Sequence, residues 1–397
     1  FFRYLGSFQK ITSNLNELNS ASKSMNLGIL CDYFWPSVGG VEHFVEDLGI
    51  RLLEHGYQVT VFCRQLNSRT SFSYKGLKII DLIINQSNDS TLSAECIKNF
   101  NSELRTHGIG RIIAISQPDN WIGSLLSQVP HEVAKIVYLP SISAFNLIQW
   151  GKSGVPECVM KSLARANSIV AVSESGYDSI FLKANNLLYS YIPHSMDRIE
   201  PKQSFRLKFG IEKSKFLLIT VANFWPVKNH LELIQIMTED NNDWLLYIIG
   251  NKIDSEAAYY EQVQNLSIND PRIILIPGLD RELTAAAIKE ADLLLVPSLA
   301  ESAGPLVVLQ AMSYGTPWIA TPRCNSVKDE AGGLITNIED FPSTIEYLRR
   351  NSSISAELSK LGQEHWERSL TWSSTIHYYL ELLGDEQNVI RANIPYD

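Results

Sequence analysis

Residues 26–64 read NLGILCDYFWPSVGGVEHFVEDLGIRLLEHGYQVTVFCR. The stretch contains an apolar strand, a turn with two glycines, a long amphipathic helix and a second apolar strand. Short apolar strands that alternate with helices are typical of parallel sheets joined by right-handed crossovers. The stretch therefore predicts one unit of a doubly wound α/β fold, in which ligands bind beyond the carboxyl ends of the strands.

The alternation continues along the chain and restarts after one interruption. Residues 192–204, IPHSMDRIEPKQS, contain two prolines and several polar residues that break the periodicity. A second series of apolar strands follows, so we expect two Rossmann-like doubly wound domains that face one cleft, at residues 26–195 and 196–370. Helices of the second series are expected at residues 229–238, 255–265 and 281–290 and from Pro305 onward.

Helices are also expected at both ends of the chain. In the N-terminal extension, residues 1–25, apolar side chains recur at helical spacing, which fits a helix packed on the domain or one that binds a membrane surface or a partner. The last helical stretch, 355–385, is long enough to return to the first domain, and residues 371–397 are assigned to this crossing. The sequence starts without a methionine, so a longer parent protein is left open.

The composition excludes several classes of protein. With 397 residues, 45% hydrophobic and 19% charged, the chain can form two packed domains. A net charge of -9 argues against nucleic acid as a partner. Five scattered cysteines without a CxxC pair fit a reducing cytoplasm rather than a disulfide framework or a zinc site. No apolar run is long enough to span a bilayer, which leaves peripheral contact with the inner membrane face open.

Residues 297–317, PSLAESAGPLVVLQAMSYGTP, have the chemistry of a site for an anion and a sugar. An apolar strand end leads to a loop with Glu301 and Gly304, and a helix is expected to start at Pro305. Unpaired backbone NH groups and a partial positive charge at a helix start suit a diphosphate. Glu301 and Gln310 can bind the hydroxyls of a sugar and a ribose. The segment therefore predicts a nucleotide-sugar site.

Two other segments follow strands and could face the same cleft. Gly39 and Gly40 would let backbone NH groups approach a phosphate, although a plain tight turn explains the pair equally well. In VANFWPVKNH, Lys228 could neutralise a leaving diphosphate, whereas an exposed lysine is usually only a solvated charge. Asn223 can form a hydrogen bond with a phosphate but carries no charge.

No metal or cofactor is expected. His43, His107 and His194 are isolated histidines without ligand-like spacing, so structural or exposed roles are expected for them. The chain has no GxSxG motif and no Walker loop, which removes the main support for hydrolase and kinase functions.

Four segments together resemble the family 4 retaining glycosyltransferases, which have the two-domain GT-B architecture. They are PSVGGVEHFVEDLGIRLLEHGYQVTVFC, VAVSES with YIPHSMD, VANFWPVKNH, and PSLAESAGPLVVLQAMSYGTPWIAT. They occur in the family's order over roughly residues 26 to 385. The resemblance implies transfer of a sugar from a nucleoside diphosphate to an acceptor hydroxyl with the anomeric configuration retained.

The resemblance also implies roles for individual residues, with three departures from the family pattern. Asn223 stands where an arginine is expected beside Lys228. Gln310 replaces the second of two glutamates and lies one residue too far from Glu301, so that either Glu301 or Ser302 holds the sugar. Lys228 and Glu301 are the implied catalytic residues. The implied donor-binding residues are Gly39, Gly40, Asn223, Lys228, Gly250, Glu301, Ser302, Ala303, Gly304, Pro305, Leu306 and Gln310.

On the acceptor side, Ser116 within IAISQP replaces a histidine that the family often has. UDP is the preferred donor nucleotide, and a glycan, a lipid-linked saccharide or a protein could be the acceptor. The departures leave two rivals open. One is a weakened sugar-nucleotide-binding module of a larger assembly, and the other is an epimerase or phosphorylase with the same architecture.

Overall fold

The structure, a computed structural model, describes residues 25–84, 92–240, 242–302 and 304–384. The helix expected over residues 1–25 lies outside the described residues except for its last position. The same holds for Ala303 and for the tail after residue 384.

Within the described residues, the first sheet has eight strands in the order β3-β4-β2-β1-β5-β6-β7-β8, of which only β3 and β4 pair in antiparallel fashion. Strands β1 and β5 are neighbours at the point where the strand order reverses, which is where such sheets bind ligands. The strands are β1 (Asn26–Cys31), β2 (Gln58–Arg64), β3 (Ser73–Tyr74), β4 (Leu77–Leu82), β5 (Arg111–Ser116), β6 (Lys135–Pro140), β7 (Ser168–Ala171) and β8 (Ser190–Tyr191). The helices are α2 (Gly40–Glu54), α3 (Ala94–Thr106), α4 (Trp121–Leu126), α5 (Ala144–Ser153), α6 (Glu157–Arg165) and α7 (Tyr177–Ala184).

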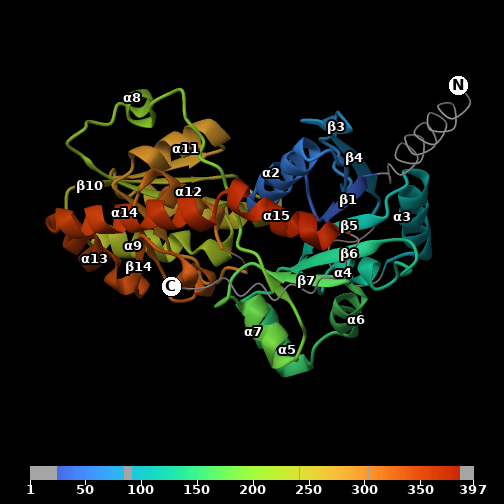
Figure 1. Cartoon of the computed structure of the whole chain (residues 1–397). Helices are drawn as coiled ribbons and strands as arrows, with labels where there is room; N and C mark the ends of the chain where they lie inside the picture. Colours follow the sequence, from blue (N-terminus) through green and yellow to red (C-terminus); the bar gives the residue numbers. More distant parts are fainter. Residues whose placement is uncertain (1–24, 85–91, 241, 303, 385–397) are drawn as a thin grey trace, which may run out of the picture.

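In the part of the chain that the structure describes, the second sheet has six strands, all parallel, in the order β11-β10-β9-β12-β13-β14. Its strands are β9 (Phe216–Val221), β10 (Trp244–Gly250), β11 (Ile273–Pro277), β12 (Leu293–Val296), β13 (Trp318–Ala320) and β14 (Gly333–Ile335). Its helices are α8 (Phe205–Phe209), α9 (His230–Glu239), α10 (Ala257–Ser267), α11 (Arg281–Glu290), α12 (Leu306–Tyr314), α13 (Phe341–Arg350) and α14 (Ser352–Ser369). The two α/β domains lie side by side (Figure 1).

Apolar side chains cover both faces of each sheet, as parallel sheets require. In the first domain, α2 packs on one face, and α3, α4 and α6 pack on the other. In the second domain, α8, α11, α12 and α14 cover one face, and α9, α10 and α13 cover the other. The carboxyl ends of the strands are thereby left free to line a cleft.

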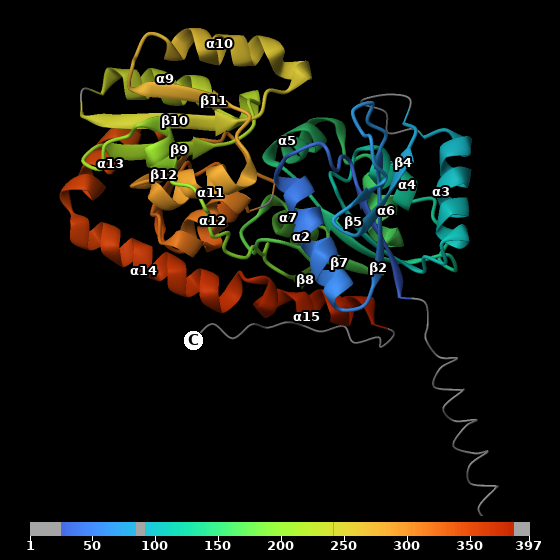
Figure 2. The ribbon, with the colours of Figure 1, turned by 90° about the horizontal axis from the view of Figure 1, so that it is seen from above.

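The last helical stretch differs from the expectation of one helix over residues 355–385. It forms two helices, because α14 ends at Ser369 and the Thr371 side chain then caps α15 (Trp372–Leu383) by accepting from the backbone NH of Ser374. Helix α15 runs back along the first domain (Figure 2), where Trp372 and Tyr379 join its core. At its end, the Arg111 and Lys135 side chains donate to the carbonyls of Leu383 and Gly384.

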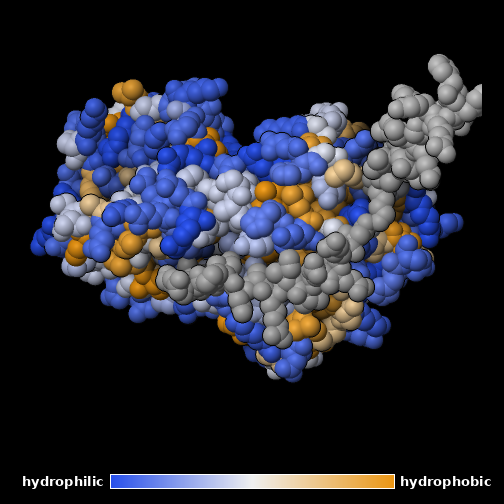
Figure 3. Space-filling view, in the orientation of Figure 1, coloured by the Kyte–Doolittle hydropathy of each residue, from blue (hydrophilic) through white to orange (hydrophobic). Residues whose placement is uncertain are grey.

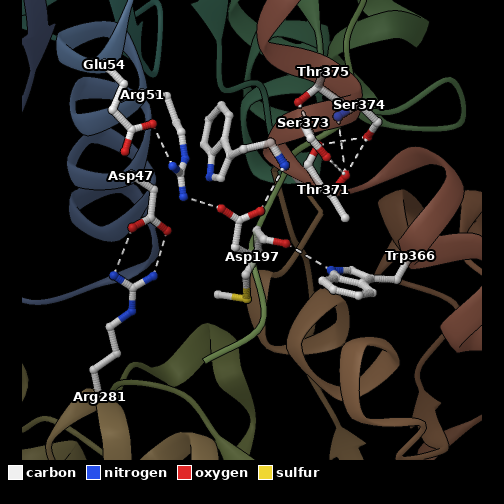
Figure 4. Close-up of polar contacts among 12 residues, drawn as sticks. Asp47, Arg51, Glu54, Asp197, Arg281, Trp366, Thr371, Ser373, Ser374 and Thr375 are labelled. Atoms are coloured by element: carbon white, nitrogen blue, oxygen red, sulfur yellow. Dashed lines mark hydrogen bonds and ion pairs between the residues drawn. The ribbon is translucent and has the colours of Figure 1, made fainter. Parts of the chain in front are cut away.

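Ion pairs join the domains along the notch visible between them in Figure 3. Arg281 donates to both carboxylate oxygens of Asp47, at 3.0 and 2.6 Å, and Arg51 pairs with Asp197 (Figure 4). Helix α2 therefore contacts both the second domain and the segment that connects the two. These ion pairs hold the two domains together beside the space between their strand ends.

Candidate nucleotide-sugar site

A cavity of about 490 Å³ lies between the carboxyl ends of the two sheets. Residues after β1, β5 and β6 line it from the first domain, and residues after β9, β10 and β12 line it from the second. This volume lies within the usual range for small-molecule sites. The cavity is therefore large enough for a nucleotide and a sugar.

The Lys228 ammonium lies between both carboxylate oxygens of Glu301, at 2.7 and 2.8 Å. Lys228 ends a short 3-10 helix that starts at Pro226 and directly follows β9. The Leu299 amide donates to the Val227 carbonyl at 2.8 Å, which ties this turn to the loop that carries Glu301. Because the exposed fractions of the two side chains are only 25% and 11%, their opposite charges interact strongly.

The loop after Glu301 leads into α12, whose first residue is Leu306 and whose N-cap is Pro305. No described side chain caps this helix, so its first backbone NH groups are available to an anion. The Ser302 hydroxyl accepts a hydrogen bond from the Ser141 hydroxyl of the first domain at 3.0 Å. The loop and helix start thus lie against the cavity, and Leu306 lines it.

Gln310 lies one turn further along α12 and also lines the cavity. Its exposed fraction is 6%, and its amide Nε2 has no hydrogen-bond partner within the described parts of the chain. An unpaired buried donor is costly. This nitrogen lies beneath the cavity surface, where the Tyr314 side chain is close to it.

Asn223 connects the second domain to the glycine loop of the first. Its Nδ2 donates to the Val38 carbonyl at 3.3 Å, and its Oδ1 accepts from the backbone NH of Asn251 at 3.2 Å. Helix α2 starts at Gly40 with an extended Gly39 as N-cap and no side-chain cap. The polar atoms of Asn223 are thus engaged in holding the loop that precedes this helix start.

Two predicted positions have other structural explanations. A Cβ at Gly250 would come within 1.9 Å of the Ala222 carbonyl, so close packing of two strand ends requires glycine there. Ser116 is buried, and its hydroxyl faces that of Tyr138 at 3.4 Å. Its neighbours Ile115 and Gln117 line the cavity, whereas Ser116 lies beneath that surface.

The structure adds residues to the cavity wall that the sequence did not single out. Arg281 lines the cavity while Asp47 and Glu46 of α2 hold its guanidinium. His194, interpreted from the sequence as structural or exposed, also lines the cavity. His194 stands in the segment YIPHSMD, but nothing in the sequence places either side chain at the cavity, because each reaches the site only through the approach of the two domains.

The lysine and arginine charges on the described cavity wall are confined to one side. The described lining residues include one lysine, Lys228, and one arginine, Arg281, and both belong to the second domain. The described residues contain no group of three or more His, Cys, Asp or Glu that could hold a metal ion. Within the same residues, no helix is long and apolar enough to cross a membrane.

Two parallel-sheet α/β domains with a ligand cavity between their strand ends define the GT-B class of fold. Residues 201–348 match the family model described as glycosyl transferases group 1. N-acetyl-alpha-D-glucosaminyl L-malate synthase from Bacillus anthracis is 26% identical over 92% of this chain and 99% of its own length. The second domain therefore matches this glycosyltransferase family, and the chain is a glycosyltransferase.

Another relative is the D-inositol 3-phosphate glycosyltransferase of Mycobacteroides abscessus, 28% identical over 46% of this chain and 42% of that protein. Among solved structures, sucrose-phosphate synthase from Thermosynechococcus elongatus has a TM-score of 0.74 at 18% identity and covers 90% of this chain and 98% of that one. Anabaena HepE in complex with UDP and glucose has a TM-score of 0.72 at 15% identity, with coverages of 90% and 99%. These likenesses confirm the expected GT-B fold.

Proposed function

We propose that this glycosyltransferase takes a hexose from a UDP-sugar and transfers it, with retention, to a hydroxyl of a glycan. The observation that carries the proposal is the Lys228–Glu301 pair beside the uncapped start of α12. A cation and free NH groups suit a diphosphate, and a carboxylate suits sugar hydroxyls. UDP is supported by the solved HepE complex with UDP and glucose.

In this proposal each group has a defined part. The bond between the anomeric carbon and the diphosphate oxygen breaks, while Lys228 and the NH groups at the start of α12 stabilise the negative charge on the diphosphate. Glu301, fixed by Lys228, orients the sugar hydroxyls. Ser302 and Gly304 shape the loop around the sugar, and Gln310 contacts the ribose.

The acceptor hydroxyl attacks the anomeric carbon on the face that the diphosphate leaves. Its proton passes to an oxygen of the departing phosphate, so the step needs no strong protein base. The apolar first-domain wall, with Phe44, Ile115 and Leu139, excludes water that would otherwise hydrolyse the donor. Cytoplasmic location and contact with lipid-linked or protein acceptors remain predictions.

The test is release of nucleoside diphosphate from a panel of UDP-, GDP- and ADP-sugars, with glycan, lipid-linked and peptide acceptors. We expect turnover of a UDP-sugar, and a loss of about 10²-fold or more in Glu301→Ala and in Lys228→Ala. Glu261→Ala, at an exposed position on α10, serves as the matched control and should keep full activity. Undiminished release in both site variants would contradict the proposed site, and release only from GDP- or ADP-sugars would contradict the choice of UDP.

A further inference from the structure

The imidazole of His194 lies on the cavity wall where the two domains meet. It follows β8 in the segment between the domains, and its ring packs against that of Phe44 with centroids 4.7 Å apart. Its Nδ1 lies 3.0 Å from the carbonyl oxygen of Gly304. The ring is thus held by α2 on one side and by the loop before α12 on the other.

This contact fixes which ring nitrogen carries the proton. A carbonyl oxygen can only accept, so the hydrogen bond requires the proton on Nδ1 and leaves a lone pair on Nε2. Nε2 has no hydrogen-bond partner within the residues that the structure describes. Burial lowers the pKa of His194 to about 4, so the ring is neutral near pH 7. The wall therefore offers a free acceptor of hydrogen bonds.

The low pKa also decides between two roles for this nitrogen. A general base works best when its pKa is near the operating pH, and a ring with a pKa of about 4 takes up a proton poorly at pH 7. An acceptor in a hydrogen bond needs only the lone pair. Hydroxyl groups, which must donate somewhere when they are buried, are the fitting ligands.

The position of the ring indicates which hydroxyls it can reach. His194 is bonded to Gly304, which belongs to the loop that follows Glu301. Under the proposed function, on which this step rests, that loop surrounds the transferred sugar. Ser116 offers no alternative acceptor at the cavity surface because it is buried against Tyr138.

We propose that Nε2 of His194 accepts a hydrogen bond from one hydroxyl of the transferred sugar, which makes His194 a determinant of donor specificity. The Nδ1–H bond to Gly304 fixes the ring, and because His194 lines the cavity, Nε2 is the nitrogen left for a ligand. A donor that lacks the donating hydroxyl leaves this acceptor unpaired and binds less tightly.

The experiment measures binding of UDP, UDP-glucose, UDP-N-acetylglucosamine and their analogues in which one hydroxyl at a time is replaced by fluorine, which cannot donate. We expect one replacement to weaken binding to the wild type by about five- to tenfold. In His194→Phe, which preserves a ring against Phe44, the same replacement should change binding by less than about twofold. UDP itself, without a sugar, should discriminate little between the two proteins.

The outcomes separate this inference from the proposed function and from a merely structural role. If His194→Phe weakens UDP and both nucleotide sugars equally, and the fluorine effect persists in it, His194 only supports the loop and the inference is wrong. A wild type that binds nucleotide sugars without any fluorine effect also overturns the inference alone. A wild type that binds none of these nucleotides, nor any sugar nucleotide of the wider panel, overturns both.

Discussion

The two walls of the cavity differ in charge. The first-domain wall is largely apolar, with Val41, Phe44 and Leu139, and carries no lysine or arginine among the described lining residues. The second-domain wall carries Lys228 and Arg281, each paired with a carboxylate. This difference indicates that the second domain binds the charged part of an anionic ligand. Approach of the first domain then adds apolar contact and excludes water.

The largest expected difference between the two walls is seen when one residue on each wall is substituted. We expect Lys228→Met to lower kcat/KM by about 10²- to 10³-fold, because the leaving charge loses its cation and Glu301 is left unpaired. Val41→Ala, on the apolar wall, should cost about threefold or less. Lys213→Met, at an exposed site, is the control for steady-state kinetics. Equal losses in Lys228→Met and Val41→Ala would contradict the one-sided arrangement.

Acid should destabilise the fold through two histidines that burial keeps neutral. Burial lowers the pKa of His194 to about 4, and burial together with the nearby Lys228 charge lowers that of His230 to about 3. Since the unfolded chain binds these protons more readily, stability is full above about pH 6.5 and falls as the pH drops toward 4 and below. Protonation of each ring should lower the free energy of unfolding by roughly 3 kcal/mol or more once the pH is below the pKa of that ring in the folded protein.

The measurement is the free energy of unfolding by urea between pH 7.5 and 4. His194→Asn should flatten this dependence, whereas His131→Gln, at an exposed position, should leave it unchanged. A dependence in the His194 variant as steep as in the wild type would mean that another group governs acid sensitivity.

The ion pair between Arg281 and Asp47 tests how the two walls are joined, because it links the charged wall of the second domain to helix α2 of the first (Figure 4). We expect Arg281→Asp and Asp47→Arg each to raise KM for the donor by about tenfold, since like charges then oppose closure. The double exchange should recover most of the loss. Salt titration and small-angle scattering check closure, and failure of the double exchange to recover activity would assign Arg281 a direct contact with the ligand.

The smallest expected effect on KM comes from the uncharged hydrogen bond between Asn223 of the second domain and Val38 of the first. Asn223→Ala removes the hydrogen bond to the Val38 carbonyl and should raise KM for the donor by about threefold with little change in kcat. A loss comparable with that of Lys228→Met would show that Asn223 binds the diphosphate directly despite its contact with Val38.

The periodicity of the sequence predicted the two domains, because apolar strands and amphipathic helices alternate wherever both faces of a sheet are covered. Helix α11 was predicted with the bounds that the structure has, Arg281–Glu290. The break between Ser369 and Trp372 was missed, because residues on both sides keep helical spacing and only the Thr371 side-chain cap marks the start of α15. Strand β4 (Leu77–Leu82) was also missed, since its polar positions weaken the apolar pattern.

For the site, local motifs were informative and contacts between domains were not. Glu301 and Lys228 stand in segments with recognisable chemistry, and the structure brings their side chains together. The link of Asn223 to Val38 and that of His194 to Gly304 join residues more than 100 positions apart. No spacing rule covers such pairs, because they depend on how two separately formed domains approach each other.

Helix α15 has a consequence for how the chain acquires its structure during synthesis. Trp372 and Tyr379 complete one face of a sheet whose last strand ends at Tyr191, so the part of that face that α15 covers stays exposed while about 180 further residues are made. At roughly 5 to 20 residues per second, the delay is on the order of 10 to 40 seconds. During this interval the nascent first half exposes apolar surface that a chaperone would have to shield.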